Sequence, residues 1–529
     1  MSFRGYGVAL ILLLALVGAK VTAAEGQAVG DPTPLWSGLP PGPFPVGFRV
    51  LYRLDRSRVW GPTPDSALGG ESARPIRVSV WYPALRASNR ARMRYQDYIQ
   101  FAAPDPYFGP LNAMLLARDT QSLREIFAGA ERYYRSALVL PMVARRDAPP
   151  ARGRFPLVLY SQGWNSSHQH DNVVLAEFLA SHGYVVAAVP QVGETVKDLA
   201  LQINLPDLET QMRDVEFAIG VAQLLPFVER RKLALMGWSM GGIVSLWISG
   251  RNPMVAAVVG LDASFRAHDF VKLTFSSPYF DIRRLRAPLL ALQSGNEKYV
   301  RGQDDRVVDS LHFADRFVGR VANITHGDFS DFAMLAKLFP VAILDRTAEE
   351  ASRGHETVCR VVRTFLDGAL KGDERALGGL RDSTPFAGLT LTHYQAAAVP
   401  SEEELVALAA RDGLPATIAQ LQQLQAAHPE LVIIRYAVMT RLGYRLLREG
   451  RPDAAIDAFR LDTEAYPTSA DGFDSLADGY LAKADSASAR RAYERVLELL
   501  PSDSTLDGNA REELRGRATE RLRALRSSP

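Results

Sequence analysis

The chain has 529 residues, of which 47% are hydrophobic and 23% are charged, a composition typical of globular domains and not of a disordered chain. Its formal net charge of +2 argues against nucleic acid as the main partner, because phosphate binding relies on a basic surface. The single cysteine, Cys359, excludes an internal disulfide, and its amphipathic surroundings predict a small buried core residue.

The first 24 residues have the pattern of a secretory signal peptide. Arg4 gives a positive start, residues 8–17 are an unbroken apolar run, and residues 22–24 are small enough for cleavage. A membrane-spanning helix needs about 20 apolar residues, so this run is too short to be one. We therefore predict a cleaved signal in residues 1–24 and an exported protein, periplasmic or secreted.

Residues 25–375 alternate between short apolar segments and amphipathic ones. The predicted strands are residues 78–83, 157–161, 184–189, 232–236, 256–261, 288–293 and 321–324. Helical patterns separate several of them, at residues 173–182, 208–225 and 240–250, and a last helix follows at 355–370. This alternation predicts a mostly parallel sheet with helices on both faces. Residues 86–150 are helical and rich in aromatics, and we interpret them as an insertion that covers the site, with an ordinary helical layer as the alternative.

Residues 376–400 are interpreted as a connector, and residues 401–529 as a separate helical domain that contains a repeat. Helices are predicted at residues 415–427, a degenerate unit, and at 509–526, a polar cap. Five positions recur 34 residues apart: Leu442, Leu446, Ala455, Phe459 and Pro467 correspond to Leu476, Tyr480, Ala489, Tyr493 and Pro501. The period and residue types resemble the tetratricopeptide repeat, whose stacked helix pairs offer a concave surface to a protein partner.

The segment Gly237-Trp238-Ser239-Met240-Gly241 follows a predicted buried strand and opens a predicted helix, which is the setting of a nucleophile elbow. In so tight a turn, side chains two residues before and two residues after the serine would clash, and glycine at both places removes them. The turn lifts the Ser239 hydroxyl to the end of the sheet, where the first N–H groups of the helix face a reacting carbonyl. Ser239 is therefore the predicted nucleophile.

A serine nucleophile needs a general base, and in this kind of fold the chain order is serine, acid, histidine. His326 lies in a loop just past the late predicted strand 321–324, where the base is expected. His312 and His355 lie in helical patterns and are predicted to be surface residues. His326 is therefore the predicted base.

Two carboxylates are candidates for the acid that orients His326. Asp262 ends the strand at residues 256–261, and Glu297 follows the next strand along the chain. Both positions can serve in this fold. Asp304 and Asp305 lie further along, so the spacing of the residues leaves the choice open.

Several further motifs accompany the elbow in order along the chain. They are Val80-Trp81-Tyr82-Pro83-Ala84, residues 156–163, residues 180–189, Gly260-Leu261-Asp262-Ala263, and His326 with Phe329, Asp331 and Phe332. With these motifs, residues 45–370 resemble the platelet-activating-factor acetylhydrolase-like branch of the α/β-hydrolases. In that branch the acid follows the strand just past the elbow helix, which implies Asp262 in preference to Glu297. The chain departs from the branch at Gln162, where histidine usually precedes the glycine.

The same resemblance implies two donors for an oxyanion hole, the backbone N–H groups of Met240 and Trp164. A third motif, His168-Gln169-His170-Asp171, has the composition of a metal-ligand cluster. Alternate residues at the start of a helix point in different directions, and no fourth ligand is evident. We therefore predict no metal and no cofactor.

Taken together, the residues predict an exported serine hydrolase that cleaves carboxylic esters, short-chain or phospholipid-like, through an acyl-enzyme. An acyltransferase or a peptidase would use the same residues. A hypothesis of another class is a catalytically inactive scaffold that binds proteins through its helical repeats. The intact set of serine, histidine and acid favours the enzyme.

Overall fold

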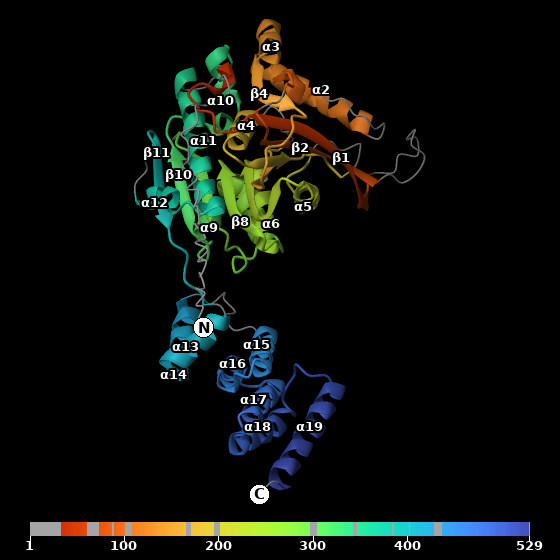
Figure 1. Cartoon of the computed structure of the whole chain (residues 1–529), viewed down its shortest axis with the longest axis vertical. Coiled ribbons are helices and arrows are strands. Elements are labelled where there is room, and N and C mark those ends of the chain that lie inside the picture. The colour runs from red at the N-terminus through yellow and green to blue at the C-terminus, as the bar shows by residue number, and fades with distance from the viewer. Residues whose placement is uncertain are drawn as a thin grey trace, which may run out of the picture. The chain divides into compact units, whose positions relative to one another are not determined.

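The computed structural model describes residues 33–60, 73–86, 89–100, 108–164, 171–194, 201–296, 304–341, 346–382, 386–400, 402–427 and 436–527. The predicted signal segment lies outside these residues. The chain divides into two compact units. The second unit consists of residues 281–286, 310–315 and 395–529, and the first contains the remainder. Figure 1 labels the helices and strands of both units.

The first unit is built on one sheet. Its eleven strands in the described residues have the order β11-β10-β9-β8-β7-β5-β6-β2-β1-β4-β3. The six from β6 to β10 run parallel to one another. The strands are β1 (Val46–Val59), β2 (Ala73–Pro83), β3 (Arg92–Arg94), β4 (Pro141–Arg146), β5 (Phe155–Ser161), β6 (Val185–Ala188), β7 (Val228–Trp238), β8 (Val255–Leu261), β9 (Leu289–Ser294), β10 (Arg316–Val321) and β11 (Leu389–Tyr394).

Helices cover both faces of this sheet, as predicted. On one face, α4 (Val173–Ser181) and α11 (Ala348–Lys371) share an apolar cluster with alternate strand residues such as Val158 and Tyr160. On the other, α5 (Leu205–Gln223) and α6 (Met240–Arg251) pack against each other and against β5 and β7. Because side chains of a strand alternate between the two faces, a strand buried on both is apolar throughout, and every residue of β5 is buried.

The remaining helices of the first unit are short or lie outside the parallel part of the sheet. They are η1 (Pro34–Trp36), α1 (Gln96–Ile99), α2 (Gly109–Ile126), α3 (Glu131–Leu138), η3 (Ser264–Arg266), α7 (His268–Ser276), α9 (Arg306–Asp309), η4 (His326–Phe329), α10 (Phe332–Leu338) and α12 (Glu374–Asp382).

The segment at residues 86–150 differs from the expected helical insertion. Besides α1, α2 and α3 it contributes two strands, and β4 pairs with β1 in parallel and with β3 in antiparallel fashion. These strands extend the sheet beyond β1. Each is short and carries arginines, so neither shows the apolar alternation that identifies a strand in a sequence.

The segment at residues 376–400 differs from the expected connector. It contains most of α12 and the strand β11, which pairs antiparallel with β10 from Arg316↔Tyr394 to Val321↔Leu389. Leu389 and Leu391 do alternate with polar residues, as in a half-buried edge strand. The sheet therefore extends further along the chain than we predicted, although this alternation is present in the sequence.

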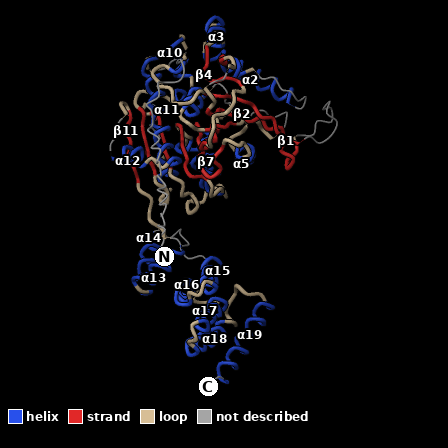
Figure 2. Tube along the Cα trace, in the orientation of Figure 1, coloured by secondary structure: helices blue, strands red, loops and turns tan. Residues whose placement is uncertain are grey.

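In the second unit the described elements are all helices, and Figure 2 shows no strand after β11 in the described residues. Both predicted repeats are helix pairs: α15 with α16, and α17 with α18. Phe459 and Tyr493, at matching positions of the repeat, are fully buried. The assignment to the tetratricopeptide class stays a prediction. The helices are α13 (Glu402–Asp412), α14 (Leu414–Ala427), α15 (Tyr436–Arg448), α16 (Pro452–Ala465), α17 (Ala470–Ala482), α18 (Ser486–Leu499) and α19 (Gly508–Ser527).

Among the helices in the described residues, none has the length and apolar character required to cross a bilayer.

Candidate functional site

Ser239 occupies the sharp turn between β7 and α6. Its backbone angles, φ 54° and ψ −125°, lie in a region that residues with side chains rarely adopt. A β-carbon at Gly237 would lie 2.1 Å from the carbonyl oxygen of Gly241, and one at Gly241 would lie 2.1 Å from that of Ser161. Neither glycine can therefore be replaced without moving the backbone, which is the steric requirement expected of a nucleophile elbow.

The neighbouring strand β8 fixes this turn. The Ser239 N–H donates to the Leu261 carbonyl at 3.1 Å, and the Ser264 N–H donates to the Ser239 carbonyl at 2.9 Å. These two bonds continue the pairing of β7 with β8 past the end of the strands. They help to stabilise the strained conformation of Ser239, because strain persists only where the surrounding structure determines it.

Asp262 and His326 lie together at the carboxyl ends of the strands. Oδ2 of Asp262 is 2.7 Å from Nδ1 of His326. The Asp262 side chain is 14% exposed and that of His326 is 41% exposed, so the carboxylate is shielded while the imidazole is accessible. A carboxylate at Nδ1 favours the tautomer with the proton there, which leaves the Nε2 lone pair available to act as a base.

The Ser239 hydroxyl makes a long hydrogen bond with the Ser264 hydroxyl, O–O 3.5 Å. Within the described part of the chain, no hydrogen bond joins Ser239 to His326. Bonds between nucleophile and base are often long without substrate and shorten in the Michaelis complex. The structure therefore joins Asp262 to His326 directly and has Ser239, the predicted nucleophile, on its elbow at the same end of the sheet.

His326 lies in the short helix η4, and its local structure differs from the prediction. The strand β10 ends at Val321, not at residue 324, because Asn323 takes a φ of 56° that breaks the extended conformation. Thr325 then caps η4: its N–H and hydroxyl donate to Oδ2 of Asp328 at 2.7 and 3.0 Å. Asp328 is buried and also pairs with Arg346, so the loop that carries His326 is anchored to the segment before α11.

A second carboxylate anchors the other end of the same loop. Oδ2 of Asp331 accepts the N–H groups of Val173 and Val174, at 2.7 and 3.2 Å, at the N-terminus of α4. The Asp331 N–H donates to the Asp171 carbonyl at 2.6 Å. Burial raises the pKa of Asp331 well above its ordinary value, although the two helix N–H groups favour its charged form. Asp331 thus joins the His326 loop to the helix that follows the predicted oxyanion loop.

The prediction that His355 lies on the surface is wrong. His355 is on α11 and is fully buried, with Nδ1 3.0 Å from the Asp328 carbonyl oxygen and Nε2 3.8 Å from Oδ1 of Asp331. Burial lowers the pKa of His355 to about 4. Its contacts are with the anchors of the His326 loop, not with Ser239.

The predicted oxyanion donors lie at two adjoining strand ends. Met240 is the first residue of α6, and an N–H at that position has no acceptor within its own helix. Trp164 follows β5; its side chain is 50% exposed, and its Nε1 donates to the Leu201 carbonyl. Gly163 lies between β5 and Trp164, and a β-carbon there would be 3.4 Å from the β-carbon of Ser239. The loop therefore runs beside Ser239.

Gln162, which replaces the expected histidine, is fully buried and links two loops. Its side-chain Nε2 donates to the Val189 carbonyl after β6. The backbone carbonyl of Gln162 accepts from Nε2 of Gln191 at 2.7 Å. Arg118 on α2 donates to the Gln191 carbonyl at 3.1 Å, which connects the insertion to this end of the sheet. No sequence motif indicates Gln191, because its role depends on which loops the fold brings together.

The remaining candidate residues divide into two groups. Glu297, the alternative acid, and His168 and His170 of the metal-like motif lie outside the described residues. Asp304 and Asp305 are described, and each pairs with an arginine: Asp304 with Arg306 at 2.6 Å, and Asp305 with Arg266. No cluster of three or more potential metal ligands occurs among the residues that the structure describes.

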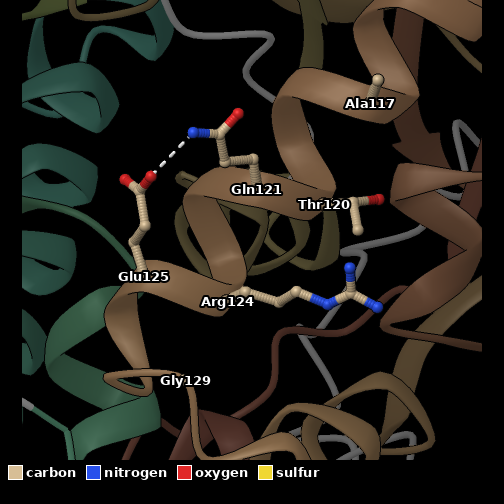
Figure 3. Close-up of a pocket in the computed structure, with 6 residues that line it drawn as sticks. All are labelled: Ala117, Thr120, Gln121, Arg124, Glu125 and Gly129. Carbon is tan, nitrogen blue, oxygen red and sulfur yellow. Dashed lines mark hydrogen bonds between the residues drawn. The ribbon is translucent and has the colours of Figure 1, made fainter.

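A hollow on the insertion contains none of the predicted site residues. Figure 3 shows it on α2, with Gln121 donating to Glu125 at 3.0 Å along the helix. It is lined by Ala117, Thr120, Gln121, Arg124, Glu125 and Gly129. We assign no function to it.

The order β1-β2-β6-β5-β7-β8-β9-β10, with β2 antiparallel and the elbow after β7, is that of the α/β-hydrolase fold. No profile of a known protein family and no curated protein matches this sequence. Among solved structures, the chain is similar to a ferulic acid esterase from Streptomyces cinnamoneus, at 21% identity over 66% of this chain and 96% of that chain, with a TM-score of 0.47.

Proposed function

We propose that this chain is an exported serine hydrolase that cleaves carboxylic esters with Ser239 as nucleophile, His326 as base and Asp262 as orienting acid. The observation that carries the proposal is the 2.7 Å contact between Asp262 Oδ2 and His326 Nδ1, at the end of the sheet where the elbow presents Ser239. A shielded carboxylate on an accessible imidazole is the arrangement that activates a serine hydroxyl.

In the proposed reaction, Ser239 Oγ attacks the ester carbonyl while Nε2 of His326 takes the hydroxyl proton. The backbone N–H groups of Met240 and Trp164 donate to the oxyanion that forms. The carbon–oxygen bond to the leaving alcohol then breaks, and His326 delivers the proton to that alcohol. Water repeats these steps on the acyl-enzyme, which releases the carboxylic acid and restores the Ser239 hydroxyl.

Labelling with a fluorophosphonate probe tests the proposal, because such probes react with activated serines. We expect covalent labelling of the full chain at Ser239 and its loss in Ser239→Ala and His326→Ala. Ser245→Ala is a matched control, because Ser245 is a buried serine of α6 with no part in the proposed chemistry, and this variant should label normally. A folded wild-type chain that does not label at Ser239 would favour the inactive scaffold instead.

The substrate class that we propose is a short-chain or phospholipid-like ester. Aryl esters with acyl chains of two to sixteen carbons would define the acyl preference. Comparing hydrolysis with transfer to an added alcohol or amine in the same assay would distinguish a hydrolase from an acyltransferase. A peptide substrate serves as the test for peptidase activity.

Export remains a proposal that rests on the pattern of residues 1–24. Mass spectrometry of protein from the native host should find an N-terminus at Ala24 or Glu25. Recovery of a chain that still begins at Met1 from the cytoplasm would contradict it. We also propose a protein partner for the helical repeats, and it can be sought among proteins that copurify with the exported chain from the native host.

A further inference from the structure

Trp238, the residue before the proposed nucleophile, contacts the proposed base in two ways. Its indole ring stacks on the imidazole of His326, with ring centroids 5.3 Å apart and an angle of 27° between the planes. Its Nε1 also donates a hydrogen bond to the backbone carbonyl of His326 at 3.1 Å. The same side chain therefore contacts both the ring and the main chain of His326.

The indole also lies against the loop that follows β5. A β-carbon at Gly163 would be 2.8 Å from Cε3 and 2.9 Å from Cζ3 of Trp238, closer than side-chain carbons approach one another. Gly163 directly precedes Trp164, whose backbone N–H is a proposed oxyanion donor. The Trp238 ring thus lies close to both the oxyanion loop and the His326 loop.

Strand pairing fixes the backbone of Trp238, and this limits where its indole ring can lie. Trp238 ends β7 and pairs with Leu261 of β8, and the next residue, Ser239, donates its N–H to the same Leu261. The indole is partly buried and packs against the main apolar core of the first unit. A ring held in this way restricts both loops that it contacts.

His326 needs such a restraint because of where it lies. Its side chain is 41% exposed on a short 3₁₀ helix, and the bond from Nδ1 to Asp262 fixes one point of the ring. The covalent link through Cβ and this single hydrogen bond still allow the plane of the imidazole to tilt. A flat surface against one face of the ring removes this freedom and keeps Nε2 directed along one line.

We infer that Trp238 is a positioning residue that sets His326 and the oxyanion loop at a fixed separation around Ser239. The inference rests on the proposed function and adds to it a residue that acts through the base rather than on the substrate. The stack orients the imidazole plane, the Nε1 bond anchors the His326 main chain, and the ring edge limits the approach of Gly163.

Two substitutions separate the contributions of the indole. Trp238→Leu removes the stack and the hydrogen bond, whereas Trp238→Phe keeps an aromatic ring and loses the N–H donor. We expect Trp238→Leu to lower kcat and the rate of fluorophosphonate labelling about 100-fold with little change in KM, as misplacement of a reacting group does. Trp238→Phe should recover most of this loss and remain about tenfold slower than wild type, the effect of one hydrogen bond.

A matched control is available in α6. Trp247 is fully buried in the same unit, and its ring contact is with Tyr279, not with the proposed site. Trp247→Phe should lower the melting temperature and leave the labelling rate of the folded protein unchanged. The two variants are therefore compared at equal melting temperature. If Trp238→Leu then labels more slowly than the Trp247 variant, the loss comes from a misplaced His326 and not from lower stability.

A double-mutant cycle tests directly whether the Trp238 ring limits the approach of Gly163. Gly163→Ala should slow labelling in the wild-type background, because the new methyl group displaces the indole. In the Trp238→Leu background the same change meets no indole, so its cost should largely disappear, since substitutions that share a contact are not additive. If Gly163→Ala slowed labelling equally in the two backgrounds, the contact between the Trp238 ring and Gly163 would have no role in positioning the loop.

The inference fails if Trp238→Leu labels and turns over like wild type while wild type labels at Ser239; the proposed function then stands alone. It also fails if Trp238→Phe and Trp238→Leu are equally impaired, because the ring would then have no positioning role. Absence of labelling in folded wild-type protein overturns both the inference and the proposed function.

Discussion

Asp262 contacts His326 through only one of its two carboxylate oxygens. Oδ2 lies 2.7 Å from Nδ1 of His326, while Oδ1 accepts the backbone N–H of Ser294 at 2.9 Å. Asp262 itself is held at the end of β8 with a φ of 40°, and its N–H donates to the Leu292 carbonyl at 2.7 Å. Strand β9 therefore sets the angle at which the carboxylate meets the imidazole.

The first prediction follows from this arrangement. Asp262→Asn keeps the shape of the side chain, but its amide group cannot accept from Ser294 and from His326 equally well, and the wrong imidazole tautomer is favoured. We expect kcat on an aryl ester to fall by about 10³-fold or more, as in other triads that lose the acid. Circular dichroism should show a folded protein.

Glu297→Gln is the matched comparison, because it makes the same chemical change at the alternative acid. It should leave kcat near that of wild type. If Glu297→Gln were the more damaging substitution, Asp262 would not be the acid, while the proposals for Ser239 and His326 would stand.

The second prediction concerns the stability of the first unit. Glu177 on α4 is fully buried and accepts four hydrogen bonds: Oε1 from the Tyr98 hydroxyl at 2.6 Å and the Ala144 N–H at 2.8 Å, and Oε2 from Trp36 Nε1 and the Val143 N–H, both at 3.1 Å. Three of the partners are N–H groups that can only donate, so either orientation of a glutamine amide would set its NH₂ group against at least one of them. Glu177 therefore joins η1, α1, β4 and α4, and a carboxylate accepts from all four partners at once.

Glu177→Gln should lower the free energy of unfolding by about 3 kcal/mol, the order observed when a buried charged group loses its partners. Unfolding in urea, followed by fluorescence, measures it. Glu125→Gln on the exposed side of α2 is the control and should change stability by less than about 0.5 kcal/mol. Equal effects of the two substitutions would show that Glu177 is not the anchor described.

The sequence predicts the parallel part of the fold well because its signals are local. Every residue of β5 is apolar enough to be buried, and the glycines at 237 and 241 have no alternative in so tight a turn. The proximity of Asp262 and His326 follows from their places after β8 and β10, two parallel strands of one sheet that are separated only by β9. Asp262 could be preferred to Glu297 as the proposed acid only through the resemblance.

Other features depend on contacts between segments far apart in the sequence. The pairing of β3 and β4 with β1 and the bond between Gln191 and Gln162 leave no pattern in the sequence. The burial of His355 does leave one: His355 precedes Cys359, Val362 and Leu366 at helical spacing, which places it on the buried face of α11. Its polar character, not its position, led to the wrong prediction.

The third prediction is a pH dependence. Burial lowers the pKa of His182 to about 4, against an ordinary value of 6.5, and the hydrogen bond of Nδ1 with the Phe178 carbonyl opposes the shift without cancelling it. The unfolded chain therefore binds more protons between these values. The contribution of His182 to stability is complete above pH 6.5 and is lost as the pH falls towards 4, with a slope of at most about 1.4 kcal/mol per pH unit.

His182→Gln removes a group that cannot be protonated easily in the folded state. The free energy of unfolding should therefore fall less between pH 7 and pH 5 than it does in wild type. Urea unfolding midpoints at the two pH values measure this difference. Part of the loss should remain, because the pKa of buried His355 is lowered in the same direction. His268→Gln, at an exposed position, should keep the full wild-type pH dependence, and an equal effect there would rule out His182 as the source.

The last prediction concerns where the first unit ends. All of the proposed site residues precede β11, so a chain cut after Pro400 should keep esterase activity on a small aryl ester. It should be less stable, because Phe313, which belongs to an apolar cluster of the second unit with Leu405 and Val406, would lose those partners.

A chain cut after residue 388 also loses β11, which leaves the backbone groups of β10 unpaired along six residue pairs from Arg316↔Tyr394 to Val321↔Leu389. An exposed edge of this kind favours aggregation. We therefore expect the shorter chain to be largely insoluble while the longer one is soluble and labels with fluorophosphonate. Complete loss of labelling in a longer chain that is still folded by circular dichroism would mean that residues beyond Pro400 shape the site itself.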